Sequence, residues 1–238
     1  MSANELDSAT QLDILTRGEM SIAMRMPYSS NATYLVSLNL ADQSVRAIYK
    51  PIQGERPLWD FGPGLHRREV AAYRLSEAMG LQCVPPTILR DGPNGEGSVQ
   101  LWIDADPEQH YFTIFEQRED LHDQFRGMCA LDIVANNSDR KSGHVLVDKD
   151  SRVWGIDQGL CFSADFKLRT VIWEFGGEPI ADSLLKKIGR LGEQVPLEVA
   201  TLLTEQEVAA ISDRAKWLHA GAHFPVDPSG RHYPWPLV

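Results

Sequence analysis

The feature that most limits how this chain can fold is a change of character close to residue 104. Before it, short segments with strand-like alternation, broken by turns rich in Gly, Pro and Asn, surround one helical stretch. After it, the apolar residues recur mostly at helical spacing. We therefore predict an α+β fold: a tail over residues 1–17, a β-rich lobe with one helix over 18–104, and a mainly helical lobe over 105–238.

The first lobe is predicted to run strand, strand, strand, helix, strand, strand. The expected ranges are a hairpin at 19–40 that turns at 27–31, a strand at 45–50, a helix at 65–79, and strands at 84–89 and 98–103. Alternation places Val45, Ala47 and Tyr49 on one face of the third strand. In the helix, Glu69 lies on a face that is otherwise mostly apolar.

The second lobe is predicted to begin with a helix, continue through a polar loop into a short hairpin, and end in helices. The expected ranges are a helix at 121–134, a loop at 136–143, hairpin strands at 145–147 and 153–156, helices from residue 181 onward, and an irregular tail from residue 224.

Charge and composition narrow the function. A net charge of -10 argues against nucleic acid as the main partner and against stable docking on an anionic membrane, because both require a basic surface. The polar, acidic start has no signal-peptide pattern, and no apolar run is long enough to cross a bilayer. Cys83, Cys129 and Cys161 are far apart and are expected to be buried free thiols. We therefore expect a cytoplasmic protein.

Residues 135–162 carry the strongest chemical signal. Asp139 opens a loop, His144 precedes the first hairpin strand, and Asp157 follows the second. Folding the hairpin about residues 150 and 151 places His144 opposite Asp157, with Asp139 on the adjoining loop. Phosphoryl transfer needs a carboxylate to orient the attacking hydroxyl and further ligands for the metal on the phosphates. The alternative is that both aspartates are ordinary turn residues.

Lys50 closes an early strand, and Glu69 follows it by 19 positions on a helix. A lysine held in this way by a glutamate is directed at nucleotide phosphates in kinases. Considered alone, the pair is better explained as a solvated lysine at a sheet edge and an unrelated glutamate on a helix surface, and the kinase interpretation is favoured only together with the Asp139–Asp157 segment.

Two further segments are candidates for contacts with a nucleotide. The turn formed by Ser29, Ser30, Asn31, Ala32 and Thr33 offers amides and hydroxyls that could cradle phosphates, or it is a simple polar turn. Leu101, Trp102 and Ile103 offer apolar walls and backbone hydrogen bonds for a nucleotide base, or they belong to the core.

The order of these motifs resembles the phosphatidylinositol 3-/4-kinase superfamily, in particular the small phosphatidylinositol-kinase-like proteins of actinobacteria. It is also similar to type II phosphatidylinositol 4-kinases and, more distantly, to HipA-type serine kinases. The segments that carry the resemblance are SSNAT (29–33), YKPIQGERP (49–57), REVAAYRLSEAMGLQCVPPT (68–87), NNSDRKSGHVLV (136–147) and GIDQGLCF (155–162).

The resemblance implies a two-lobed protein-kinase-like fold that uses ATP with Mg²⁺ or Mn²⁺. It makes Asp139 the catalytic residue, places Lys50 on the phosphates with Glu69 holding it, and gives the metal to His144 and Asp157. The sequence departs from the family in two places. His144 stands where the family has asparagine, and residues 53–67 lack the cysteines that are palmitoylated in type II enzymes.

These features predict transfer of the γ-phosphate of ATP to a hydroxyl of a soluble acceptor, either a protein or a polyol-like metabolite. Two alternatives remain. One is a nucleotide-binding regulator with little turnover, and the other is a transferase that moves AMP.

Overall fold

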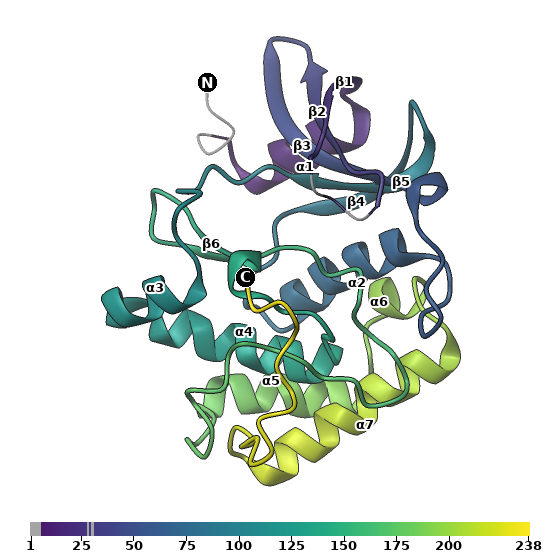
Figure 1. Cartoon of the computed structure of the whole chain (residues 1–238). Coiled ribbons are helices and arrows are strands. Elements are labelled where there is room, and N and C mark those ends of the chain that lie inside the picture. The colour runs from purple at the N-terminus through teal and green to yellow at the C-terminus, as the bar shows by residue number, and fades with distance from the viewer. Residues whose placement is uncertain (1–5, 28, 30) are drawn as a thin grey trace. The chain divides into compact units, whose positions relative to one another are not determined.

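The computed structural model describes residues 6–27, 29 and 31–238, and it divides into two compact units (Figure 1). Unit 1 contains residues up to Val70 and Pro85–Ile103, and unit 2 contains Ala71–Val84 and Asp104–Val238. The predicted α+β class is confirmed, since an antiparallel sheet is combined with a largely helical unit. None of the helices within the described residues has the length and apolar character needed to cross a membrane.

Unit 1 is built on a five-stranded antiparallel sheet of order β1-β2-β3-β5-β4. Its strands are β1 (Glu19–Arg25), β2 (Tyr34–Leu40), β3 (Gln43–Pro51), β4 (Thr87–Gly92) and β5 (Gly95–Leu101). The predicted first hairpin and third strand are confirmed. The last two strands are separated by fewer residues in the sequence than predicted. Pro85 and Pro86 delay the start of β4, and the pairing continues to Gly92 opposite Gly95.

The sheet packs a core on one side. Val45, Ala47 and Tyr49 alternate into that core, as predicted from their spacing. Where only a tail was predicted, residues Ser8–Arg17 form α1, which buries Ile14 and Leu15 against the sheet. The helix begins after Asp7, whose carboxylate accepts a hydrogen bond from the Thr10 amide and caps the helix.

The predicted helix of the first lobe is α2 (Leu65–Ala78), and the boundary between the two units falls within it. Its predicted face is buried throughout, including the polar side chains of Glu69 and Ser76. A short 3₁₀ helix, η2 (Ile52–Gly54), lies between β3 and α2. Two buried polar residues on one helix face need hydrogen-bond partners, so this face must make polar contacts as well as apolar ones.

Unit 2 is mainly helical. Its elements are α3 (Tyr111–Gln117), η3 (Glu119–Leu121), α4 (His122–Ala135), η4 (Ser142–His144), β6 (Val145–Val147), β7 (Val153–Gly155), α5 (Asp182–Glu193), α6 (Leu197–Ala200) and α7 (Glu205–Gly221). All of them except α3 and the 3₁₀ turns were predicted. Helix α4 is buried from Gly127 to its end, and α7 packs against both α4 and α5 (Figure 1). From Phe224 onward no helix or strand forms, as predicted. The three cysteines are buried and free, also as predicted.

Candidate active site

Lys50 and Glu69 form an ion pair within unit 1, from the Lys50 ammonium to Glu69 Oε1. Lys50 lies near the end of β3, and Glu69 lies in the second turn of α2. The Glu69 side chain is 3% exposed and the Lys50 side chain is 23% exposed. Burial of the glutamate makes its attraction for the lysine stronger than at a surface, so the lysine is held in one position while its ammonium stays partly accessible.

The predicted phosphate-binding turn is tied to the loop after β3. Ala32 donates its amide to the Gly54 carbonyl at 3.0 Å, and Asn31 Oδ1 accepts from the Arg56 amide at 2.9 Å. A Cβ on Gly54 would lie 2.4 Å from the Ala32 Cβ, so this close approach requires glycine. Ser29 Oγ donates to Thr33 Oγ1, while Ser30 lies outside the described residues. The amide of Ala32 is therefore engaged within the protein rather than presented to a phosphate.

The segment predicted to contact a nucleotide base is largely core. Leu101 and Ile103 are 3% and 6% exposed. Trp102 is partly exposed, its amide donates to the Arg46 carbonyl at 3.0 Å, and the Arg46 guanidinium lies 5.4 Å from the centroid of its ring. Of the three side chains, Trp102 is therefore the most accessible to a ligand.

In unit 2, Asp139 sits on the loop that follows α4. The helix ends at Asn136 in a left-handed conformation, and Asn137 Oδ1 then accepts the Asp139 amide at 3.0 Å. Burial raises the pKa of the Asp139 carboxyl, although Lys141, 3.5 Å away, acts in the opposite direction. An aspartate whose pKa is raised is a stronger base, as general-base catalysis requires.

His144 connects Asp139 to Asp157. Its Nδ1 lies 3.0 Å from the backbone carbonyl oxygen of Asp139 and 3.4 Å from the backbone amide nitrogen of Lys141. Its Nε2 lies 3.6 Å from Asp157 Oδ2. The predicted hairpin register was wrong by one residue: Val145 pairs with Gly155 rather than Ile156. The expected proximity of His144 and Asp157 still holds, because the Ile156 amide donates to the His144 carbonyl at 3.0 Å.

Asp157 adopts a φ of 58°, in the left-handed region that few residues other than glycine enter. Its side chain is 53% exposed. Strained backbone at a polar residue is typical of functional sites, where the fold holds a side chain in a defined direction. Here the turn directs the carboxylate to the same place as the imidazole.

The donor set, one imidazole nitrogen and one carboxylate, could hold a divalent cation that keeps other ligands. The Nδ1 atom of His144 contacts the backbone of its own loop, and the second ring nitrogen, Nε2, lies beside the Asp157 carboxylate. Within the described residues no cluster of three or more His, Cys, Asp or Glu side chains is arranged around a common metal position. Two protein ligands fit Mg²⁺ or Mn²⁺, since Mg²⁺ is usually held by one or two carboxylates together with substrate phosphates and water.

A buried ion pair that sequence reasoning missed supports this site. Arg140 is 0% exposed and Asp132, on α4, is 1% exposed, with 2.9 Å between Nη2 and Oδ1. Arg140 Nη1 also donates to the carbonyls of His144 and Ile156. A Cβ on Gly155 would lie 3.1 Å from this guanidinium, so glycine makes room for it. Arg140 thus ties α4 to His144, just before β6, and to Ile156, just after β7.

The signal for this pair was present in the sequence. Asp132 is the only charged residue in the run MCALDIVA, where a buried carboxylate requires a partner. Burial alone would lower the pKa of Arg140, but the Asp132 carboxylate more than offsets burial and the pKa is raised.

The fold belongs to the protein-kinase-like class. A solved structure of hydra Fam20 with sugar aligns with a TM-score of 0.56 and 14% identity over 91% of this chain and 89% of that chain. The Helicobacter pylori proinflammatory kinase CtkA aligns with a TM-score of 0.51 and 11% identity over 88% and 94%. At these identities the likeness concerns the fold alone.

Sequence comparison identifies the family. Protein Rv2133c of Mycobacterium tuberculosis (strain H37Rv) is 35% identical over 260 aligned positions that cover 94% of each chain, and this chain belongs to its family. Phosphatidylinositol 4-kinase gamma 3 of Arabidopsis thaliana is 26% identical over 64% of this chain, but the match covers only 35% of the plant protein. No family model matches the chain.

Proposed function

We propose that this protein is an ATP-dependent phosphotransferase that moves the γ-phosphate to a hydroxyl of a soluble acceptor, a protein or a small polyol-like metabolite. The observation that carries the proposal is the group formed by Asp139, His144 and Asp157, in which the imidazole lies between the backbone carbonyl of Asp139 and the carboxylate of Asp157. The likeness to the plant phosphatidylinositol 4-kinase and to the fold of CtkA adds support.

Each residue has a distinct role in this proposal. Lys50, held by Glu69, contacts the ATP phosphates and offsets their negative charge. Asp139 accepts or orients the proton of the acceptor hydroxyl, and its raised pKa suits that task. His144 and Asp157 would hold Mg²⁺ or Mn²⁺. Such a cation would supply positive charge that offsets the negative charge of the phosphates.

The preference for a soluble acceptor rests on charge. At a net charge of -10, long-range electrostatics oppose approach to an anionic bilayer. Residues 53–67 contain no cysteine that could carry an acyl chain. A lipid acceptor would therefore have to be bound without long-range electrostatic attraction to the bilayer and without an acylated cysteine in this segment.

The proposal is tested by incubating the protein with γ-labelled ATP and Mg²⁺ or Mn²⁺, alone and with arrays of proteins and polyols. We expect label to appear on an acceptor or on the protein itself. Parallel incubation with α-labelled ATP distinguishes AMP transfer, since only that reaction leaves the α-label on the product. Nucleotide binding without transfer of either label would favour a regulator over an enzyme.

A further inference from the structure

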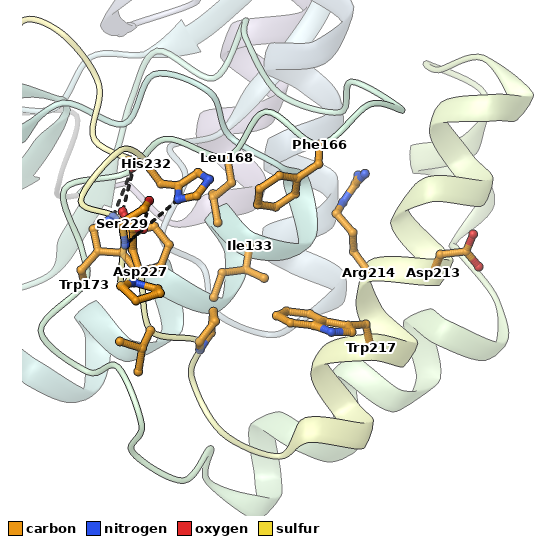
Figure 2. Close-up of a pocket in the computed structure, with 13 residues that line it drawn as sticks. Ile133, Phe166, Leu168, Trp173, Asp213, Arg214, Trp217, Asp227, Ser229 and His232 are labelled. Carbon is orange, nitrogen blue, oxygen red and sulfur yellow. Dashed lines mark hydrogen bonds and ion pairs between the residues drawn. The ribbon is translucent and has the colours of Figure 1, made fainter.

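Outside the candidate active site, each unit contains a histidine that contacts a carboxylate. In unit 2, His232 lies at the wall of a cavity together with Asp227, whose carboxylate is 3.0 Å from His232 Nδ1 (Figure 2). Asp227 also accepts hydrogen bonds from the Ser229 hydroxyl at 2.6 Å and from the His232 amide at 2.9 Å. All three residues belong to one short stretch of chain, so these contacts stabilise the turn that the stretch forms.

His66, in unit 1, instead connects three segments that lie apart in the sequence. It is the second residue of α2, and its side chain is 1% exposed. Its Nδ1 lies 2.7 Å from Oε1 of Glu55, on the loop after β3, and its Nε2 lies 3.1 Å from Oε1 of Glu96, on β5. Glu55, His66 and Glu96 thus form a cluster, the His66 clamp.

The geometry of the clamp defines its charge. Ionised carboxylates only accept hydrogen bonds, so both contacts are satisfied when each ring nitrogen carries a proton and the ring is an imidazolium. Burial alone would lower the pKa of His66, but the two carboxylates more than offset burial and the pKa is raised. Burial alone would raise the pKa of Glu55, but hydrogen bonds from His66 and from backbone amides lower it to about 2. Arg67, 3.4 Å from Oε1 of Glu96, adds a positive charge at the exposed side.

Glu55 also fixes the start of α2. Its Oε2 accepts the Gly64 amide at 2.8 Å, and its Oε1 accepts the His66 amide at 2.9 Å. Amides in the first turn of a helix have no partner inside the helix, so a carboxylate at this end is stabilising. Gly64 has a φ of 101°, which favours glycine. The start of α2 is therefore bound to the segment that follows β3.

The clamp acts on the Lys50–Glu69 ion pair from both sides. Glu69 follows His66 by three positions on α2, so the two residues are neighbours along one side of the helix. Lys50 lies five residues before Glu55, and its strand β3 pairs with β5, where Lys50 is opposite Ser98. The carboxylates of the clamp therefore come from segments that follow or adjoin Lys50, while the imidazolium comes from the helix that carries Glu69.

We propose that the imidazolium of His66 is a positioning group for nucleotide binding, because it holds α2 where Glu69 meets Lys50. The inference rests on the proposed function, since it concerns the lysine assigned to the ATP phosphates. In protein kinases the equivalent ion pair must be in place for transfer, and the position of the helix controls it. Loosening the clamp should therefore weaken ATP binding, although no member of the clamp touches the nucleotide.

The first test is the charge of the His66 ring in the whole protein without nucleotide. Long-range proton–nitrogen correlation spectra should show both ring nitrogens protonated at neutral pH, and the signals are assigned by their loss in His66→Gln. An uncharged ring at neutral pH would overturn the proposal, whatever the protein does with ATP.

The second test is calorimetric titration of Glu96→Gln with ATP and Mg²⁺. The Glu96 side chain is 43% exposed, so the variant should fold. Loss of a negative charge by itself favours an anionic ligand, whereas loss of positioning should weaken ATP binding by about three- to tenfold. Glu19→Gln is the matched control, because it removes the same charge from an exposed glutamate of β1 in the same unit, and it should bind ATP no more weakly than the parent.

A double variant shows whether the clamp acts through the lysine. Adding Glu96→Gln to Lys50→Met should cause no further loss of ATP affinity, because residues that act through one another are not additive. Additive losses would refute the positioning role, and so would a Glu96→Gln protein that binds ATP as tightly as Glu19→Gln. If Lys50→Met alone binds ATP like the parent, the phosphate contact of the proposed function fails, and the positioning role falls with it.

Discussion

Replacing Asp132 with asparagine should destabilise the protein strongly, because it leaves the charge of Arg140 buried and unpaired. Asp132 accepts from Arg140 Nη2 at 2.9 Å, from Asn137 Nδ2 at 3.0 Å and from the Thr170 hydroxyl at 3.0 Å. Asparagine keeps the shape of the side chain but loses the negative charge. The change therefore tests the charge pair rather than the packing of α4.

The size of the expected loss of stability follows from the burial of the Asp132–Arg140 ion pair. Breaking a buried ion pair by neutralising one partner costs about 3–5 kcal/mol. For a chain of this length, about 2–4 °C of melting temperature is lost per kcal/mol, so the expected drop is about 6–20 °C. Adding Arg140→Met should recover part of the loss, because it removes the stranded charge.

The assay is thermal unfolding followed by circular dichroism, with urea unfolding as a check. Asp120→Asn is the control, since Asp120 pairs with Arg118 through side chains that are 61% and 38% exposed, and its melting temperature should match that of the parent. If Asp132→Asn melts like this control, the buried pair does not stabilise unit 2. A double variant less stable than Asp132→Asn alone would contradict the stranded-charge explanation.

Three further predictions concern the candidate site. Lys50→Met should weaken ATP binding by about tenfold or more in calorimetry. Glu69→Gln, which keeps a hydrogen-bond acceptor, should weaken it less. If Lys50→Met binds ATP as tightly as the parent, Lys50 does not contact the phosphates. The raised pKa of Asp139 means that its base form is lost as pH falls through a value above the ~3.9 of a free aspartate. Because Lys141 lowers that pKa, Lys141→Met should move the acid limb of the pH–rate profile to higher pH. An acid limb that does not move would exclude Asp139 as the titrating base. His144→Asn should retain activity and shift the metal preference from Mn²⁺ towards Mg²⁺, as an oxygen ligand replaces nitrogen, and complete inactivity would contradict this.

The elements that the sequence predicted well are those in which periodicity and packing agree. Alternation at Val45, Ala47 and Tyr49 and helical spacing in α2 each reflect the burial of one face of the element, so the pattern was sufficient. Helix α1 was not predicted because its sequence starts with polar residues. Its buried residues, Ile14 and Leu15, pack against residues of the sheet that lie far away in the sequence.

The candidate site was less predictable, because long-range contacts determine it. Spacing could place His144 near Asp157, but the register differs by one residue, because the turn closes between Asp148 and Arg152 with Ser151 in the left-handed region. A buried arginine and its partner on another element leave only a weak trace in the sequence, a lone Asp132 in an apolar run.

The most direct test of the phosphotransferase proposal compares Asp139→Asn with Asp157→Asn. ATP affinity is measured with and without Mg²⁺ or Mn²⁺, and turnover is measured from labelled ATP. We expect Asp139→Asn to keep its ATP affinity and lose about 10²–10⁴-fold in turnover, as a positioned acid–base group contributes. Asp157→Asn should lose metal-dependent ATP binding as well as turnover. Turnover of Asp139→Asn at the rate of the parent would contradict the proposal, because Asp139 would then be a turn residue without a part in the chemistry.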